Sequence, residues 1–217
     1  MANAHSTMKS ILHFSKKERV DLIVSWLTLS LAFGLVLSDN FLNIFDLAVA
    51  IPVALLAVGT GFIFHELAHR EAAKSYGFHS EFRAWYPGLA IAVGLALATG
   101  GRFIFAAPGA TYFFGTEVSR KQNGIISIAG PATNVVMGLA LTLLAALFAD
   151  KFMMSIFVYA GMINFWFAFF NLIPFGPLDG SKVLAWKPGA WIVLIAISAV
   201  LVFFPAPLFS ILRIPIA

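Results

Sequence analysis

The feature that most constrains this chain is the length of its apolar segments. The segment from Leu47 to Phe64 contains no charged residue. Of the 217 residues, 60% are hydrophobic and 11% are charged, and the mean hydropathy is +0.91. Soluble domains carry about 25% charged residues, so this composition predicts a membrane protein. Because the apolar segments are long and do not alternate with polar residues, they indicate membrane helices rather than the strands of a barrel.

Five apolar segments approach or exceed the roughly 20 residues that cross a bilayer as a helix. They end at charged or turn-forming residues and cover residues 22–37, 45–73, 124–149, 152–173 and 190–212. Pro205 and Pro207 lie inside the last segment and should kink it. We therefore expect one membrane-embedded domain over residues 1–217. It should be all-α and polytopic, with five to six transmembrane helices and a polar, basic tail at residues 1–20.

Residues 87–115 do not fit a simple membrane helix. Gly100, Gly101 and Arg102 divide them into two apolar arms, 88–99 and 103–114. A helical arm of about 12 residues rises about 18 Å, which is short of a hydrocarbon core of roughly 30 Å. We expect a re-entrant or interfacial hairpin, with or without β-structure, that turns at Gly100 and Gly101. A single short sixth helix is the alternative.

Basic residues predict the orientation of the chain, because they favour the cytoplasmic side of a membrane. The rule places the N-terminal tail in the cytoplasm, together with the bases on both sides of residues 87–115, which should therefore make no net crossing. Residues 65–69 and Asp179 then lie on the same cytoplasmic side. The net charge of +4 is explained by topology and by contact with membrane lipids, so we expect no nucleic-acid partner.

The motif His65-Glu66-Leu67-Ala68-His69 lies near the end of the second apolar segment. Two histidines four residues apart share one helix face and can bind one metal ion. Glu66 is placed to act as general base on a water that the metal activates. Ionisable residues are costly inside a membrane, so their presence there indicates a functional site. The chain has no cysteine, which leaves histidine and carboxylate as metal ligands.

A third protein ligand must come from another part of the chain, because catalytic zinc sites combine three protein ligands with one open position. Asp179 is the best candidate, since it is one of few carboxylates close to an apolar segment. Pro174 and Pro177 precede it and break the helix, and irregular backbone at membrane depth requires a neighbouring cavity or protein. Asn171 is a candidate donor to the developing oxyanion or to the substrate backbone.

Three elements, in this order, resemble the site-2 protease family of intramembrane zinc metalloproteases. They are His65–His69, the run Ala129-Gly130-Pro131-Ala132-Thr133-Asn134, and the box from Asn171 to Gly180 with Pro174, Pro177 and Asp179. The resemblance implies one zinc ion per chain, held by His65, His69 and Asp179, with Glu66 catalytic. It also implies cleavage of a transmembrane helix of a membrane-protein substrate, which must unwind first, as in regulated intramembrane proteolysis. We expect no soluble PDZ or CBS domain.

Other functions use the same residue types. A membrane metal transporter, a metal sensor or an inactive scaffold could use the same ligands, although transport needs a polar path across the bilayer, and the apolar segments contain no further acids or histidines toward the outer face. We expect Asn134 to be structural and to bond a neighbouring helix. His5, His13 and His79 are not expected to be ligands. We expect an integral protein of the cell membrane whose N-terminus and active site face the cytoplasm.

Overall fold

The computed structural model describes residues 14–105, 108–114, 117–148, 150–212 and 214. Most of the N-terminal tail, with His5 and His13, lies outside the described residues. The elements in chain order are α2 (Lys16–Leu37), α3 (Ile44–Val58), the π-helical turn η1 (Gly59–Ile63), α4 (Phe64–Ser75), β1 (His79–Ala84), α5 (Tyr86–Ala98), β2 (Gly109–Phe114), α6 (Arg120–Ala145), α7 (Lys151–Asn171), α8 (Asp179–Trp186), α9 (Pro188–Phe203) and α10 (Ala206–Ile211).

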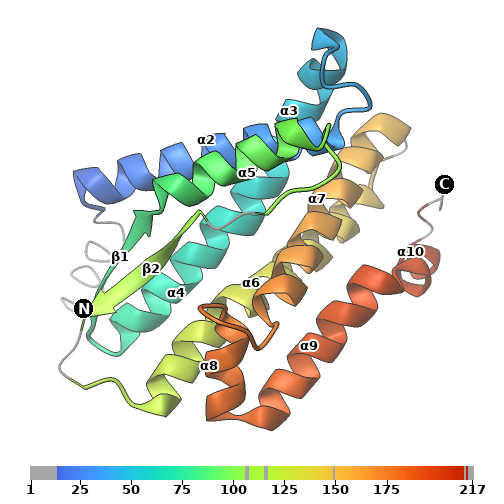
Figure 1. Ribbon diagram of the computed structural model, residues 1–217. Coiled ribbons are helices and arrows are strands. Elements are labelled where there is room, and N and C mark those ends of the chain that lie inside the picture. Colours follow the sequence, from blue (N-terminus) through green and yellow to red (C-terminus); the bar gives the residue numbers. More distant parts are fainter. Residues whose placement is uncertain (1–13, 106–107, 115–116, 149, 213, 215–217) are drawn as a thin grey trace, which may run out of the picture.

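Among the described residues, four helices are long and apolar enough to cross a membrane (Figure 1). They are Lys16–Leu37, Ile44–Ser75, Arg120–Ala145 and Lys151–Asn171, and the second of them joins α3, η1 and α4 without a break. Two shorter apolar helices, α5 and α9, and one two-stranded sheet accompany them. The chain is therefore a polytopic membrane protein of the all-α class, as its apolar segments predict.

The last apolar segment is divided by proline. Helix α9 ends at Phe203, and α10 begins at Ala206, directly after Pro205. A proline ring cannot donate a backbone hydrogen bond and clashes with the preceding turn, so the helix stops where the sequence predicts a kink. At 16 residues, α9 is shorter than the segment 190–212 from which we expected a fifth span.

Residues 79–114 form a strand, a helix and a returning strand. Strand β1 pairs antiparallel with β2, with Ala84 opposite Gly109. The chain therefore enters α5 beside the point at which it returns to β2, and this part of the chain folds back on itself. The turn follows Ala98, where Gly100 and Gly101 have φ values of +64° and +77°. The structure thus forms the expected hairpin rather than one crossing helix, with a helical first arm and an extended second arm.

Gly101 is required by close packing as well as by its backbone conformation. A Cβ atom at this position would lie 2.5 Å from the backbone oxygen of Leu35 in α2. The turn of the hairpin therefore rests directly on the backbone of α2.

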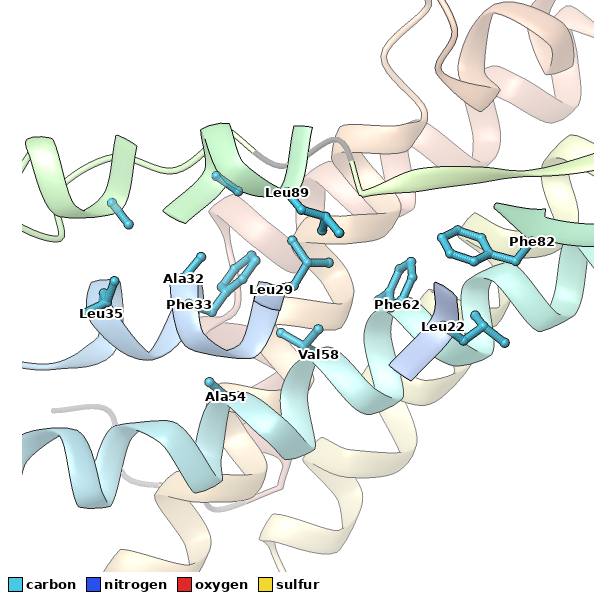
Figure 2. Close-up of a cluster of buried hydrophobic side chains, with 12 residues drawn as sticks. Leu22, Leu29, Ala32, Phe33, Leu35, Ala54, Val58, Phe62, Phe82 and Leu89 are labelled. Atoms are coloured by element: carbon cyan, nitrogen blue, oxygen red, sulfur yellow. The ribbon is translucent and has the colours of Figure 1, made fainter. Parts of the chain in front are cut away.

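A hydrophobic cluster attaches the hairpin to the helices below it (Figure 2). Its labelled members come from α2, α3, η1, β1 and α5, and are Leu22, Leu29, Ala32, Phe33, Leu35, Ala54, Val58, Phe62, Phe82 and Leu89. The rings of Phe62 and Phe82 meet edge to face, with centroids 5.4 Å apart. This contact joins β1 to η1, which immediately precedes the helix that carries the histidines.

Small residues allow α6 and α7 to pack closely. A Cβ atom on Gly138 would lie 2.4 Å from the ring of Phe165, and one on Gly161 would lie 2.6 Å from Oγ1 of Thr142. Such contacts are typical of helix pairs in membranes, where small residues let backbones approach. The polar side chains of α6 and α7 consequently reach across to the α3–α4 helix.

Candidate metal centre

Three side chains from two distant segments converge in the interior. His65 and His69 lie one turn apart on α4, and Asp179 is the first residue of α8. The Nε2 atoms of the two histidines are 3.0 Å apart, and Oδ2 of Asp179 is 3.0 Å from Nε2 of His69 and 3.3 Å from Nε2 of His65. All three residues are buried. The structure therefore places the carboxylate of α8 beside both imidazoles, which is consistent with the charge-based prediction that all three lie on the same side of the membrane.

Gly180 allows α8 to begin at this point. A Cβ atom on Gly180 would lie 2.0 Å from the backbone oxygen of Leu172, near the end of α7. Only glycine permits this approach between the start of α8 and the end of α7. The loop between them contains Pro174 and Pro177, and it turns the chain so that Asp179 faces α4.

The second nitrogen of each imidazole determines which nitrogen is available to a metal. Nδ1 of His69 lies 2.7 Å from the backbone oxygen of Ile126, and Nδ1 of His65 lies 2.6 Å from Oδ1 of Asn134. Carbonyl oxygens only accept hydrogen bonds, so we assign the proton of each neutral imidazole to Nδ1. Each Nε2 then carries a lone pair that points at the other two ligand atoms, the arrangement found behind metal-bound histidines.

The donor set fits a zinc ion. Two imidazole lone pairs and a carboxylate oxygen face one another, and all three are acceptors, so the arrangement needs a cation among them. Ligand atoms about 2.0–2.2 Å from a tetrahedral ion are about 3.3–3.6 Å from one another. The observed separations of 3.0 to 3.3 Å lie at or just below the lower end of this range.

Gly130 in α6 leaves room beside these three atoms. A Cβ atom on Gly130 would lie 2.5 Å from Nε2 of His69 and 2.7 Å from Nε2 of His65. Any larger residue would therefore occupy the space that an ion would need. This contact gives the glycine of the Gly130-Pro131 run a role that its sequence position alone does not reveal.

The charge on Asp179 suits a ligand. Burial alone would raise the pKa of its carboxyl group, but the positive charge of a protonated His69 and the hydrogen bonds that protonated Nε2 atoms of both histidines donate outweigh burial and lower that pKa below its ordinary range; a zinc ion would take the place of these protons. The carboxyl group is therefore ionised, which is the form that binds a metal. Lys182 of the same helix adds a positive charge, because its Nζ lies 3.8 Å from Oδ1 of Asp179.

A chain of amide side chains supports His65 from behind. Nδ2 of Asn134 donates to the backbone oxygen of Gly61 at 2.7 Å and to Oδ1 of Asn164 at 3.2 Å. Nδ2 of Asn164 donates in turn to Oγ1 of Thr60 at 3.0 Å. Asn134 does bond neighbouring helices, as we expected, but it also holds His65. Asn164 and Thr60 are not predicted from the sequence, although a polar residue such as asparagine within an apolar span is itself a signal of function.

Glu66 is held by the strand β2. Its Oε2 accepts a hydrogen bond from Oγ1 of Thr111 at 2.7 Å. Glu66 is only 8% exposed and lines the same cavity as the two histidines. No sequence pattern marks Thr111, because its contact with Glu66 depends on the pairing of two strands with a helix between them.

A cavity of about 240 Å³ adjoins the three converging side chains. Its lining includes His65, Glu66, His69, Asn171 and Asp179. Asn171 donates from Nδ2 to the backbone oxygen of Phe167, one turn earlier in α7, at 3.0 Å. The structure therefore brings all five predicted site residues to one cavity, but it shows no hydrogen bond between Asn171 and the other four.

The comparisons with known proteins point to the same chemistry. No protein-family model matches the chain, and no solved structure matches it significantly. A protein of Methanocaldococcus jannaschii named "putative zinc metalloprotease" is 41% identical over 185 residues, which are 85% of this chain and 92% of that protein. Identity of this extent over almost the whole length shows common descent. The chain therefore belongs to the same zinc metalloprotease family as the Methanocaldococcus protein.

Proposed function

We propose that this protein is an intramembrane zinc endopeptidase of the site-2 protease type, which cleaves a transmembrane helix of a membrane-protein substrate. The observation that carries the proposal is the convergence of His65, His69 and Asp179 beside Glu66, on a helix long enough to span a membrane. His65 lies ten residues before the last residue of that span, Ser75, a rise of about 15 Å. A peptide bond would reach this depth most directly from within the membrane.

One zinc ion per chain would be held by Nε2 of His65, Nε2 of His69 and Oδ2 of Asp179. When bound, zinc would polarise the carbonyl group of the scissile bond and make a nearby water more acidic. Three protein ligands leave one position open, as in other catalytic zinc sites. Asn134 and the backbone of Ile126 keep the two imidazoles in the tautomer that this role requires.

Glu66 would act as general base and then as general acid. It would accept a proton from the attacking water and transfer it to the leaving amine. Oε2 of Glu66 accepts the hydrogen bond from Thr111. Among the residues that the structure describes, none forms a hydrogen bond to Oε1. Asn171 uses one of its two amide N–H groups within α7. Its other N–H group could donate to the oxyanion or hold the substrate backbone.

The chemistry of hydrolysis favours an unwound substrate. In an α-helix the peptide groups are hydrogen-bonded to one another and surrounded by side chains, which make the helix about 10–12 Å wide. An extended segment presents one peptide bond at a time to the residues of the cavity. The lining includes the aromatic side chains of Phe33, Phe113, Trp166, Phe167 and Phe170. Such a surface suits the apolar side chains of a membrane segment.

We place the protein in the cell membrane with its N-terminus and active site toward the cytoplasm. The end of α4 and the start of α6 carry Arg70, Lys74, Arg120 and Lys121, and they lie at the same end of the bundle (Figure 1). The loop between α2 and α3 lies at the opposite end and carries Asp39. The positive-inside rule supports this orientation.

The proposal is tested with the purified protein in lipid vesicles that contain a transmembrane peptide. Changing Glu66→Gln should keep bound zinc and lower the cleavage rate by about 100-fold or more, because the general base is lost but the ligands remain. Glu117→Gln, at an exposed position that is not among the residues lining the cavity, is the matched control and should cleave normally. Cleavage by Glu66→Gln at the wild-type rate would contradict the proposal. Zinc transport across the vesicle membrane without peptide cleavage would instead indicate a transporter.

A further inference from the structure

A buried ion pair lies close to the candidate metal centre but takes no part in it. Nε of Arg70, in α4, lies 2.9 Å from Oε1 of Glu18, in α2. The two side chains are only 2% and 1% exposed. The guanidinium group also lies over the ring of Phe14, 4.1 Å from its centroid. Arg70 also pairs with Glu71 of its own helix. Because loss of one partner would leave a buried charge uncompensated, the pair couples α2 to α4.

Glu18 also holds the strand β1. Its Oε1 accepts a hydrogen bond from the backbone N–H of Phe82 at 3.2 Å. The side chain of Phe82 is 1% exposed and packs against Phe62 (Figure 2). Strand β1 is therefore fixed at this residue by a backbone hydrogen bond and by a buried ring.

The strand pairing connects this fixed point on β1 to Glu66. Phe82 lies directly opposite Thr111 in the antiparallel register. The hydroxyl group of Thr111 donates to Oε2 of Glu66. Glu66 lies four residues before Arg70 on α4, so both side chains project from one face of that helix. The contacts therefore connect Arg70 of α4 through Glu18, Phe82 and Thr111 to Glu66, which lies on α4 as well.

We propose that Thr111 is a positioning residue for Glu66. The Glu18–Arg70 pair holds the two-stranded sheet at the position along α4 at which Thr111 meets Glu66. The inference rests on the proposed role of Glu66 as general base. A hydrogen bond to Oε2 restricts rotation of the Glu66 carboxylate and directs Oε1 into the cavity. Thr111 acts through Glu66 and does not need to touch the substrate.

The test replaces the hydroxyl group and then restores it. Thr111→Val keeps the shape of the side chain but cannot donate, and it should lower kcat about tenfold or more with KM changed less than about twofold. Thr111→Ser keeps the hydroxyl group and should recover most of kcat. Zinc content and the unfolding temperature in detergent should be unchanged in both variants. The double variant with Glu66→Gln should be no slower than Glu66→Gln alone, because the two residues act as a unit.

Tyr112→Phe is the matched control for the hydroxyl group. Tyr112 lies next to Thr111 on β2, is 53% exposed and is not among the residues that line the cavity. Its variant should cleave at the wild-type rate.

The possible failures are distinguishable. The reaction is established if the wild-type protein cleaves the peptide and Glu66→Gln does not. If Thr111→Val then shows the same kinetics as the wild type in that assay, the inference is overturned while the proposed function stands. The inference would also be overturned if Thr111→Val lost activity because it binds less zinc. It would be overturned as well if KM rose by as large a factor as kcat is expected to fall. A zinc-loaded wild-type protein that cleaves no membrane peptide would overturn both proposals.

Discussion

At the scale of single residues, the candidate metal centre depends on groups that hydrogen-bond to the ligands or leave space beside them. The orientation of His65 is set by Asn134, and that of His69 by the backbone oxygen of Ile126. The space for an ion is set by the missing side chain of Gly130. Spacing along one helix is enough to predict that His65 and His69 face the same way. It does not predict the groups that accept a hydrogen bond from Nδ1 of each neutral imidazole and so direct the lone pair to Nε2, because those groups come from another helix.

Gly130→Ala should weaken zinc binding. The new Cβ atom would lie 2.5 Å from Nε2 of His69, so the imidazole or the helix would have to move. We expect zinc affinity to fall at least about tenfold, the effect of disturbing supporting contacts of a zinc site, with competition against a chelator as the measurement.

Gly94→Ala is the control for this substitution. Gly94 lies in α5, and among the described residues no atom of another element would lie within 4 Å of a Cβ atom added there. Alanine favours a helix over glycine by about 1 kcal/mol, so the control should be at least as stable as the wild type and should bind zinc normally. Full zinc affinity in Gly130→Ala would show that the ion does not lie beside α6.

At the scale of elements, the unit from β1 to β2 determines how Glu66 is presented. Two apolar arms and a glycine turn are visible in the sequence, and they are enough to predict a chain that folds back. They do not predict that the first arm is helix α5, nor that β1 extends the hairpin to residues that precede it. Those features depend on packing against α2, where Gly101 meets the backbone of Leu35 and Phe82 joins the buried cluster.

The register of this sheet can be tested with engineered cysteines, because the chain has none of its own. Glu81 lies directly opposite Tyr112. Cα atoms of opposed residues are about 4.5–5.5 Å apart, within the range that a disulfide can bridge. Glu81→Cys combined with Tyr112→Cys should therefore form a disulfide on mild oxidation, measured by loss of thiols that react with a maleimide.

The diagonal pair provides the control for the register. Glu81→Cys combined with Phe114→Cys places the two residues about 7–8 Å apart, at the limit of disulfide formation. This pair should oxidise much more slowly. Faster oxidation of the diagonal pair would indicate a register shifted by two residues, in which Phe82 would no longer lie opposite Thr111.

At the scale of the whole molecule, the bundle brings α8 back to α4 across more than a hundred residues of chain. His69 and Asp179 are separated by 110 positions in the sequence, yet their ligand atoms are 3.0 Å apart. The distribution of basic residues predicts that the two segments end on the same side of the membrane, since it fixes the number of net crossings between them, but it does not predict this short distance. The contribution of Thr111, Asn164 and Thr60 could not be predicted in this way, because each depends on which side chains meet once the helices have packed.

The central claim is that His65, His69 and Asp179 bind one zinc ion, and X-ray absorption at the zinc edge tests it most directly. For the purified wild-type protein, we predict one zinc ion per chain with two imidazole nitrogens and a carboxylate oxygen at about 2.0–2.2 Å. Asp179→Ala should lose the carboxylate contribution and bind zinc more weakly. A wild-type protein that binds no zinc, or an Asp179→Ala variant with an unchanged spectrum and stoichiometry, would contradict the account.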